Sequence, residues 1–316
     1  MRPNSQNANL QSGFVTLSNN PRPISGGFLK LHSFAKINVF LDVIGKRQDG
    51  YHNIVSVMQT IDLHDDLVFF KTNSTESFTL TSDSKEIPND ESNLITRAAM
   101  LMIKEYNINQ PFEINLTKRI PAGAGLGGGS SNCAAALHGI NQLFNLNITK
   151  PELESIGVAL GADVPFCING GSCMAEGIGE KLTALGSHPD CFIIIVFPGL
   201  HVPTKTIFSE LGSNNWNKGR GKLQNILRGF LFNDLTSVAF SLYNIFTDIT
   251  GAKHLEIKEL IQKLKKHGAL GASMTGTGSA VFGYFNDIQT AKKAIDNLNP
   301  MDKVFIAKPV NREMIL

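Results

Sequence analysis

Apolar and polar residues alternate along several short stretches of the chain, a pattern typical of half-buried β-strands. The clearest stretch runs from Ser33 to Val43 and places these apolar residues on one face: Ala35, Ile37, Val39, Leu41 and Val43. Further strands are predicted at residues 53–63, 66–71, 77–81, 112–120, 172–176, 191–197, 279–285 and 304–309. Apolar positions three and four apart predict helices at residues 93–106, 254–268 and 288–298. Because strands and helices do not alternate regularly, we predict an α+β fold.

A glycine-rich loop precedes a further predicted helix, which is rich in alanine. The first turn of a helix has unpartnered backbone N–H groups and the positive end of the helix dipole, so it stabilises an anion. Glycine permits positive φ and close approach, so successive N–H groups can surround phosphate oxygens. We therefore predict a phosphate-binding loop, in which Ser130 or Ser131 caps the helix or holds a phosphate-bound Mg²⁺. Its residues are Pro121, Ala122, Gly123, Ala124, Gly125, Leu126, Gly127, Gly128, Gly129, Ser130 and Ser131.

Other classes of glycine-rich segment fit less well. A Walker A loop needs Lys and then Ser or Thr after its last glycine, and this loop has no Lys. Gly123, Gly125 and Gly128 match the dinucleotide fingerprint G-x-G-x-x-G. The region about twenty residues later is polar and helix-like, however, where that fold needs a buried strand ending in an acidic residue. The chain lacks the H-R-D and D-F-G tripeptides of protein kinases. A flexible linker is disfavoured because the loop runs directly into a helix.

Three sets of polar residues are candidates for chemistry beside this loop. Lys36 and Asn38 share the second face of the first strand, where they either contact one ligand or form an ordinary solvated face. Tyr51 and His52 follow an Asp-Gly turn signal and either grip a heterocycle or lie on the surface as an unremarkable pair. Asp163 lies in the rigid segment GADVP, where it is either a catalytic base or the cap of a turn.

Composition narrows the function classes. The chain has 316 residues, 42% of them hydrophobic, enough for a large core or two adjoining domains. A formal net charge of +2 does not favour a nucleic-acid surface, and the strongest apolar run, residues 192–197, is too short to span a membrane. The four cysteines form no C-x-x-C pair and no H-E-x-x-H occurs, which indicates reduced thiols in the cytoplasm rather than a metal site.

Residues 1–27 contain two Arg and no acidic residue. They are predicted to be a disordered extension, with a transit peptide as the alternative.

A second loop of small residues lies near the C-terminus, in the segment GASMTGTGSAVFG at residues 271–283. Gly276, Thr277 and Gly278 permit close approach of the backbone to a ligand or to the first loop. This segment, the glycine loop and the strand carrying Lys36 and Asn38 together resemble the three motifs of the GHMP small-molecule kinases. The stretches AKINVFLDVIGKRQDGYHNIVSVMQTIDL and LGADVPF are similar to family members that phosphorylate 4-diphosphocytidyl-2-C-methyl-D-erythritol.

The resemblance implies transfer of the γ-phosphoryl group of ATP to the 2-hydroxyl of that small-molecule substrate, with ATP and Mg²⁺ as cofactors. It implies a ribosomal-S5-like N-terminal domain at residues 28–185 and a ferredoxin-like C-terminal domain at residues 186–316, with the active site between them. The enzyme would be a monomer or a homodimer. Another GHMP kinase, of the homoserine or mevalonate type, is the first alternative, and a dinucleotide-binding reductase is the second.

The resemblance also implies roles for individual residues. Asp163 would be the catalytic base, Lys36 its charged partner, and Asn38 would help to orient the substrate. Cytosine would be bound by Tyr51, His52 and Phe208. The glycine loop would hold the phosphates of ATP, with Asn93 and Leu94 near the nucleotide. Cys133 stands where such kinases commonly have a small residue, so its oxidation or alkylation is a possible block to ATP.

Overall fold

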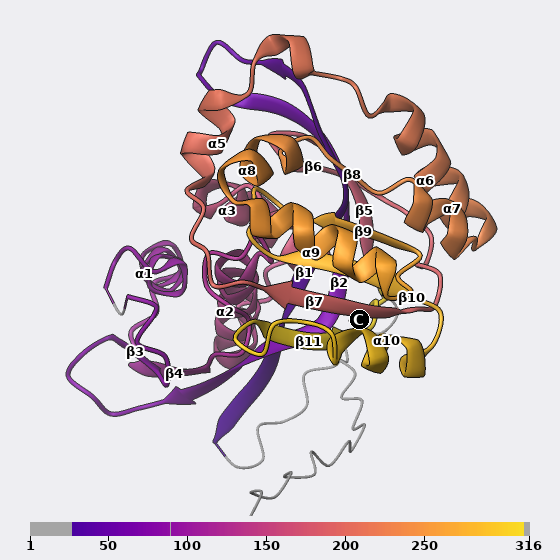
Figure 1. Ribbon diagram of the computed structural model, residues 1–316. Helices are drawn as coiled ribbons and strands as arrows, with labels where there is room; N and C mark the ends of the chain where they lie inside the picture. The colour runs from indigo at the N-terminus through magenta and orange to yellow at the C-terminus, as the bar shows by residue number, and fades with distance from the viewer. Residues whose placement is uncertain (1–26, 89, 313–316) are drawn as a thin grey trace, which may run out of the picture.

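The computed structural model describes residues 27–88 and 90–312, so most of the predicted N-terminal extension lies outside the described residues (Figure 1). Within the described ranges the strands form two sheets. The first sheet has seven strands, ordered β3-β4-β2-β1-β8, with β5 and β6 joined to β2. These strands are β1 (Phe28–Lys46), β2 (His52–Lys71), β3 (Phe78–Ser82), β4 (Phe112–Thr117), β5 (Ser172–Gly177), β6 (Lys181–Ala184) and β8 (Tyr243–Asn244).

Strands β1 and β2 are much longer than the alternation predicted. The predicted strands at 53–63 and 66–71 are one continuous strand, β2, which pairs with β1 at residues 52–60 and 64–70. The register of this pair shifts three times, once between Asn38 and Phe40. The predicted common face is therefore wrong in part: Ala35, Ile37 and Val39 share one hydrophobic cluster, whereas Leu41 and Val43 belong to another. A bulge adds a residue on one strand and so moves the later side chains to the opposite face.

A layer of helices covers one side of the first sheet (Figure 1). Its helices are α1 (Leu94–Tyr106), α2 (Gly128–Phe144), α3 (Lys150–Leu160) and α4 (Val164–Asn169). The glycine loop connects β4 to α2, as predicted, and α2 packs against both β1 and β2. Gly139 makes this close approach possible, because a Cβ there would lie 2.1 Å from the ring of Phe69. The second half of α2 therefore lies directly against β2, while Gly127, just before the start of α2, lies against Lys36 of β1.

The second sheet contains the strands of the C-terminal half in the order β11-β7-β10-β9, all antiparallel. In chain order this is the 4-1-3-2 arrangement of a ferredoxin-like fold, as expected. Helix α9 lies across β9 and β10, and α10 packs on β7 (Figure 1). The elements are β7 (Phe192–Phe197), α8 (Thr247–Lys253), α9 (Leu255–Lys266), β9 (Gly271–Met274), β10 (Val281–Phe285), α10 (Ile288–Ile295) and β11 (Lys303–Ala307).

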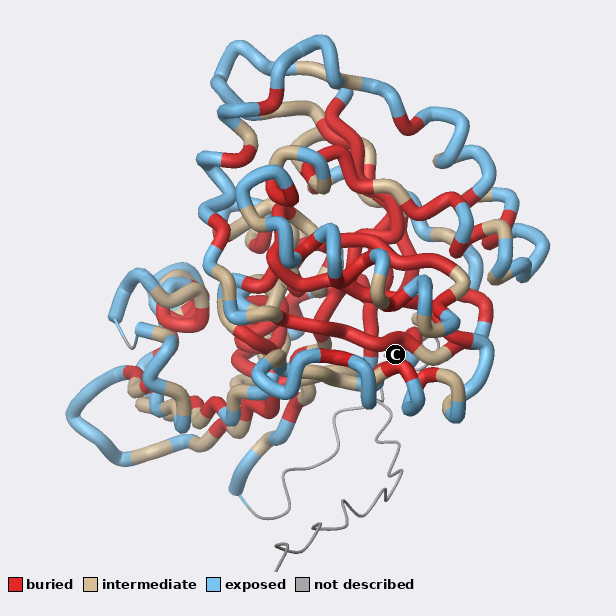
Figure 2. The backbone as a smooth tube through the Cα atoms, in the orientation of Figure 1, coloured by how far each residue is buried: buried red, intermediate tan, exposed pale blue. Residues whose placement is uncertain are grey.

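Between the two sheets lies a shared hydrophobic core, in which Ile37 and Val39 of the first sheet meet Ile193, Ile195 and Phe282 of the second. The backbone of the central strands is buried in both sheets, whereas the outer helices are largely exposed (Figure 2). Those outer elements are α5 (Thr204–Glu210), the 3₁₀ turn η1 (Ser213–Asn215), α6 (Arg220–Phe232) and α7 (Leu235–Phe240). Strand β8 follows them and completes the first sheet, so the boundary at residues 185 and 186 stays a prediction. No helix of the described chain is long and apolar enough to cross a bilayer.

Candidate active site

Lys36 and Asp163 meet beside the glycine loop. The Nζ atom of Lys36 lies 3.4 Å from Oδ2 of Asp163, and only 4% of the lysine side chain is exposed, against 34% of the aspartate. Asp163 precedes α4, but its side chain makes no capping hydrogen bond to that helix. The cap interpretation is therefore wrong, and the carboxylate is both paired with a buried cation and open to solvent. The solvated-face interpretation is wrong for Lys36 and Asn38 as well, because both are buried.

Asn38 orients the lysine. Its Oδ1 accepts hydrogen bonds from Nζ of Lys36 at 2.7 Å and from the backbone N–H of Gly276 at 2.9 Å, while Nδ2 donates to Oγ of Ser56 at 2.9 Å. Thr275, which the sequence reasoning missed, accepts a bond from the backbone N–H of Asn38 and lies 3.1 Å from the carbonyl oxygen of Gly125. The second loop of small residues, at 276–278, thus joins β1 to the glycine loop. The close approach that these small residues predicted is observed.

Two glycines of the phosphate loop make room for these contacts. A Cβ at Gly125 would lie 2.3 Å from the carbonyl oxygen of Thr275, and a Cβ at Gly127 would lie 2.8 Å from Cγ of Lys36. Gly127 has φ of 70° and precedes α2, whose first turn has no side-chain cap. A 17-residue helix therefore presents its first amides and its dipole beside Lys36, which is an arrangement suited to binding an anion.

The two serines at the helix start differ. Ser131 is buried, and its hydroxyl is hydrogen-bonded to that of Ser33, which also donates to Oδ1 of Asn132 at 2.7 Å. Ser130 is half-buried, and within the described part of the chain its hydroxyl has no partner. Of the two predicted magnesium ligands, the geometry favours Ser130.

Near these serines, Asn93 caps α1. Its Oδ1 accepts a hydrogen bond from the backbone N–H of Ile95, so this side chain already has a partner. The side chain of Leu94 faces Gly129, which keeps the start of α1 at the loop.

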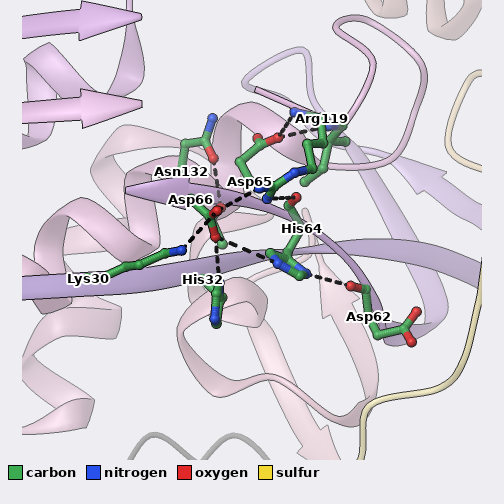
Figure 3. A network of polar contacts seen from close by, with 10 residues as sticks. Lys30, His32, Asp62, His64, Asp65, Asp66, Arg119 and Asn132 are labelled. Atoms are coloured by element: carbon green, nitrogen blue, oxygen red, sulfur yellow. Dashed lines mark hydrogen bonds and ion pairs between the residues drawn. The ribbon is translucent and has the colours of Figure 1, made fainter. Parts of the chain in front are cut away.

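A buried ion pair anchors the segment that leads into the loop (Figure 3). Asp65 is fully buried and accepts hydrogen bonds from the backbone N–H groups of Arg119 and Ile120 at 2.6 and 2.8 Å. Its other oxygen lies 2.7 Å from Nζ of Lys118. Burial lowers the pKa of Lys118, and the Asp65 carboxylate opposes this effect. One carboxylate on β2 therefore fixes the backbone immediately before Pro121.

His32, His64 and Asp66 have side chains of metal-binding types and lie close together (Figure 3). Asp66, however, already accepts from Nη2 of Arg119 at 2.7 Å and from His32 at 2.6 Å, and its carboxylate lies 3.2 Å from Lys30. Burial raises the pKa of Asp66, but these three hydrogen bonds outweigh it and hold the pKa well below its usual range. Two fixed cations at the carboxylate oppose a divalent ion, so we assign the cluster a structural role.

The residues predicted to bind cytosine include Tyr51 and His52, which lie where β1 ends and β2 begins. His52 begins β2, and its ring centroid is 5.5 Å from that of Phe208 on α5. Trp216, which the sequence reasoning missed, also contacts His52: the two ring centroids are 6.2 Å apart, in an edge-to-face arrangement. Tyr51 is 61% exposed and makes no ring contact among the described residues. The structure therefore brings His52 and Phe208 together but leaves Tyr51 at the rim.

The structure differs from the sequence-based predictions at two other residues, His201 and Cys133. His201 follows β7 and lies against the phosphate loop, where a Cβ at Gly123 would be 2.9 Å from its Nδ1. No sequence motif marks this contact. Cys133 is fully buried in α2, and burial raises its pKa to about 12, so the suggestion of a reactive thiol is not supported.

Comparison with known proteins identifies the family. The descriptions "GHMP kinases N terminal domain" and "GHMP kinases C terminal" match residues 93–171 and 225–301. The sequence is 37% identical over 286 residues to a 4-diphosphocytidyl-2-C-methyl-D-erythritol kinase of Clostridium perfringens, an alignment covering 90% of this chain and 99% of the relative. This chain belongs to the 4-diphosphocytidyl-2-C-methyl-D-erythritol kinase family. A family member of Clostridioides difficile is 43% identical over 84% of this chain and 89% of its own length.

Solved structures agree with the family. A crystal structure of 4-(cytidine 5'-diphospho)-2C-methyl-D-erythritol kinase superposes with a TM-score of 0.76 at 29% identity, covering 89% of this chain and 99% of that one. A homoserine kinase from Cytophaga hutchinsonii has a TM-score of 0.71 at 20% identity, covering 93% and 98%, and shares the fold. The prediction of a GHMP kinase is therefore confirmed, and the dinucleotide-binding reductase is wrong. In this kinase, both the glycine loop and Asp163 lie inside the matched N-terminal domain.

Proposed function

We propose that this kinase transfers the γ-phosphoryl group of ATP to the 2-hydroxyl of 4-diphosphocytidyl-2-C-methyl-D-erythritol. This step belongs to the non-mevalonate route to isoprenoid precursors. The observation that carries the proposal is the pairing of Asp163 with the buried Lys36, beside the uncapped start of α2. A base, a cation and a phosphate-binding helix are thereby gathered at one point.

The residues divide the chemistry between them. Phosphoryl transfer depends on positioning and on stabilising charge spread over the phosphoryl oxygens. Asp163 accepts the proton of the substrate hydroxyl as its oxygen attacks phosphorus. Lys36, held by Asn38, stabilises the carboxylate and the charge on the phosphoryl oxygens, while the first amides of α2 bind the remaining phosphates. Mg²⁺ carried by ATP would neutralise further charge, and the free hydroxyl of Ser130 is suited to hold it.

The spacing of the site suits a long substrate. Lys36 and Lys46, the partner of His52 in the sheet, are ten residues apart on β1, at most about 33 Å in an extended strand. Side chains that reach inward from both ends shorten this span. A nucleoside diphosphate ester, with a base at one end and an alcohol at the other, has the shape for such a site. Phe208 supplies a flat surface for the base, and the neighbouring His52 supplies ring nitrogens that can hydrogen-bond to it.

The experiment is an ADP-release assay with Mg-ATP and the proposed substrate, run on the wild type and on Asp163→Ala. We expect the variant to lose about 10²- to 10⁴-fold in kcat, the usual contribution of a general base. Calorimetric affinity for ATP should stay near that of the wild type. The matched control is Asp248→Ala, which removes a carboxylate that is 96% exposed.

The outcomes separate the substrate from the base. Folded wild type without turnover on this substrate would refute the proposed acceptor. If the wild type turns over and Asp163→Ala is fully active, the proposed acceptor substrate is supported, but Asp163 is not the catalytic base.

A further inference from the structure

Trp216 is the only tryptophan of the chain, and its place beside His52 is fixed by the backbone around it. The N–H of Asn217 donates to the carbonyl oxygen of Val43 at 2.9 Å. The N–H of Gly219 donates to Oδ2 of the buried Asp42 at 2.8 Å. Both bonds attach the segment after η1 to the end of β1, so the indole ring is held against the strand that leads to the Tyr51–His52 turn.

The indole contacts the ring of His52. The centroids are 6.2 Å apart and the planes are at 81°, an edge-to-face arrangement, while Phe208 contacts the same imidazole from 5.5 Å. Phe208 in turn packs on Phe246 in the core, with centroids 4.5 Å apart. Among the residues that the structure describes, the orientation of His52 is therefore set by two aromatic rings on separate segments, rather than by hydrogen bonds.

The indole N–H is an unusual detail of this site. Nε1 of Trp216 is buried and has no hydrogen-bond acceptor among the described residues. A buried donor without a partner is destabilising, and such groups are rare in folded proteins. Because this N–H is closed to solvent and has no partner, the indole acts at this point through its ring, which contacts His52.

We propose that Trp216 is a positioning residue of the pyrimidine subsite, which holds His52 edge-on so that its ring nitrogens face the cytosine of the substrate. This inference rests on the proposed function, whose failure the ADP-release assay reports separately. Burial, aided by the charge of Lys46, lowers the pKa of His52. The imidazole is therefore neutral at pH 7, with one donor and one acceptor nitrogen, and its orientation decides which of them meets the base.

A fluorescence titration of the unmodified protein tests the location. Because the chain has one tryptophan, any change in indole emission arises at residue 216. We expect CMP to change the emission saturably, at the concentration at which calorimetry detects CMP binding. ADP, which carries no pyrimidine, should leave it unchanged. If calorimetry shows CMP bound while the emission stays constant, the inference is overturned. If CMP does not bind at all, the pyrimidine subsite falls and the inference falls with it.

Variants test the role. Trp216→Ala should raise KM for the cytidine substrate about 2- to 10-fold, the range for one edge-to-face aromatic pair. The kcat and the KM for ATP should stay within about twofold, because only substrate binding is affected. Trp216→Phe keeps a ring edge and should restore most of the KM. The control is Phe240→Ala, which removes an aromatic side chain that is 72% exposed on α7.

The kinetic constants of Trp216→Ala distinguish a role in positioning His52 from a purely structural role in the fold. A merely structural Trp216 would lower kcat and ATP affinity together with substrate affinity, and this result would contradict the inference. An unchanged KM for the cytidine substrate in Trp216→Ala would contradict it as well. Should Trp216→Ala fail to fold, the fluorescence titration and the Trp216→Phe variant decide the matter.

Discussion

At the scale of single residues, the glycines of the phosphate loop serve two purposes. Gly127 has positive φ, which L side chains rarely adopt, and it also leaves the space that the stem of Lys36 fills. The backbone N–H of Lys36 donates to the carbonyl oxygen of Leu126 at 2.9 Å, so loop and strand are joined at this point. The position of the Lys36 ammonium group thus depends on the absence of a Cβ in the loop.

This dependence predicts the effect of Gly127→Ala. The new Cβ would lie 2.8 Å from Cγ of Lys36, so the lysine must move away from Asp163. We expect a loss in kcat of about 10²-fold, because misplacing a catalytic group by roughly 1 Å has that effect. Steady-state kinetics with the cytidine substrate measures it. Stopped-flow binding of ATP should show a smaller change.

A variant of a second glycine distinguishes the effect of backbone strain from the effect of displacing Lys36. Gly199 has φ of 77°, close to that of Gly127, but a Cβ there would have nothing within 4 Å. Gly199→Ala should therefore lose some stability and keep its kcat. Equal losses of kcat in the two variants would show that strain alone, and not the contact with Lys36, explains the effect.

At the scale of elements, local sequence patterns predicted most strands and helices but not what covers them. The alternation from Ser33 to Val43 identified β1, yet the face carrying Lys36 and Asn38 is buried because two distant loops pack on it. Periodicity also predicted the helix at residues 254–268, but it does not show that Leu255 is 63% exposed while Ile257 is buried. Contacts between segments far apart in the chain decide these cases, and no local pattern encodes them.

The junction of β4 with the glycine loop predicts the effect of Asp65→Ala. Removing this carboxylate leaves Lys118 buried without its partner and frees the N–H groups of Arg119 and Ile120. Breaking a buried ion pair in this way typically costs about 3–5 kcal/mol of unfolding free energy. Urea denaturation measures that loss. Because the anchored backbone leads into the phosphate loop, we also expect a higher KM for ATP.

An exposed ion pair serves as the control for Asp65. Asp190 lies 3.7 Å from Lys308 and is 86% exposed, so Asp190→Ala should change the unfolding free energy by less than about 1 kcal/mol. The double variant Asp65→Asn/Lys118→Met should recover part of the lost stability, since no buried charge is then left unpaired. A double variant less stable than Asp65→Ala would contradict the ion-pair explanation.

At the scale of the whole molecule, the candidate active site lies where two sheets share one hydrophobic core. The glycine motif and the family resemblance predict that the glycine loop binds phosphate, and the structure places Lys36, Asp163 and the start of α2 together beside that loop. Thr275, His201 and Trp216 were missed, because each reaches the site only when the C-terminal half packs on the first sheet. Their residue types are unremarkable in sequence, so only the tertiary arrangement reveals them.

The same shared core contains a titratable group that links folding to pH. His188 is 3% exposed, and its ring nitrogens lie 2.7 Å from the carbonyl oxygen of Pro189 and 3.0 Å from the hydroxyl of Tyr284. Burial lowers its pKa from 6.5 to about 4. The unfolded chain therefore binds this proton more readily than the folded protein does. The stability associated with His188 is fully present above pH 6.5 and is lost as the pH falls from 6.5 toward 4.

This linkage predicts a loss of up to about 3 kcal/mol between pH 6.5 and pH 4, since each unit of pKa difference corresponds to about 1.4 kcal/mol. Urea denaturation across that range measures it, and His188→Gln should show a shallower dependence than the wild type because it cannot take up the proton. The exposed His201 provides the control: His201→Gln should keep the wild-type pH profile. If His188→Gln and the wild type lose stability in parallel as the pH falls, His188 does not carry the linkage, and other buried groups, such as His138, whose pKa burial lowers to about 4, must account for it.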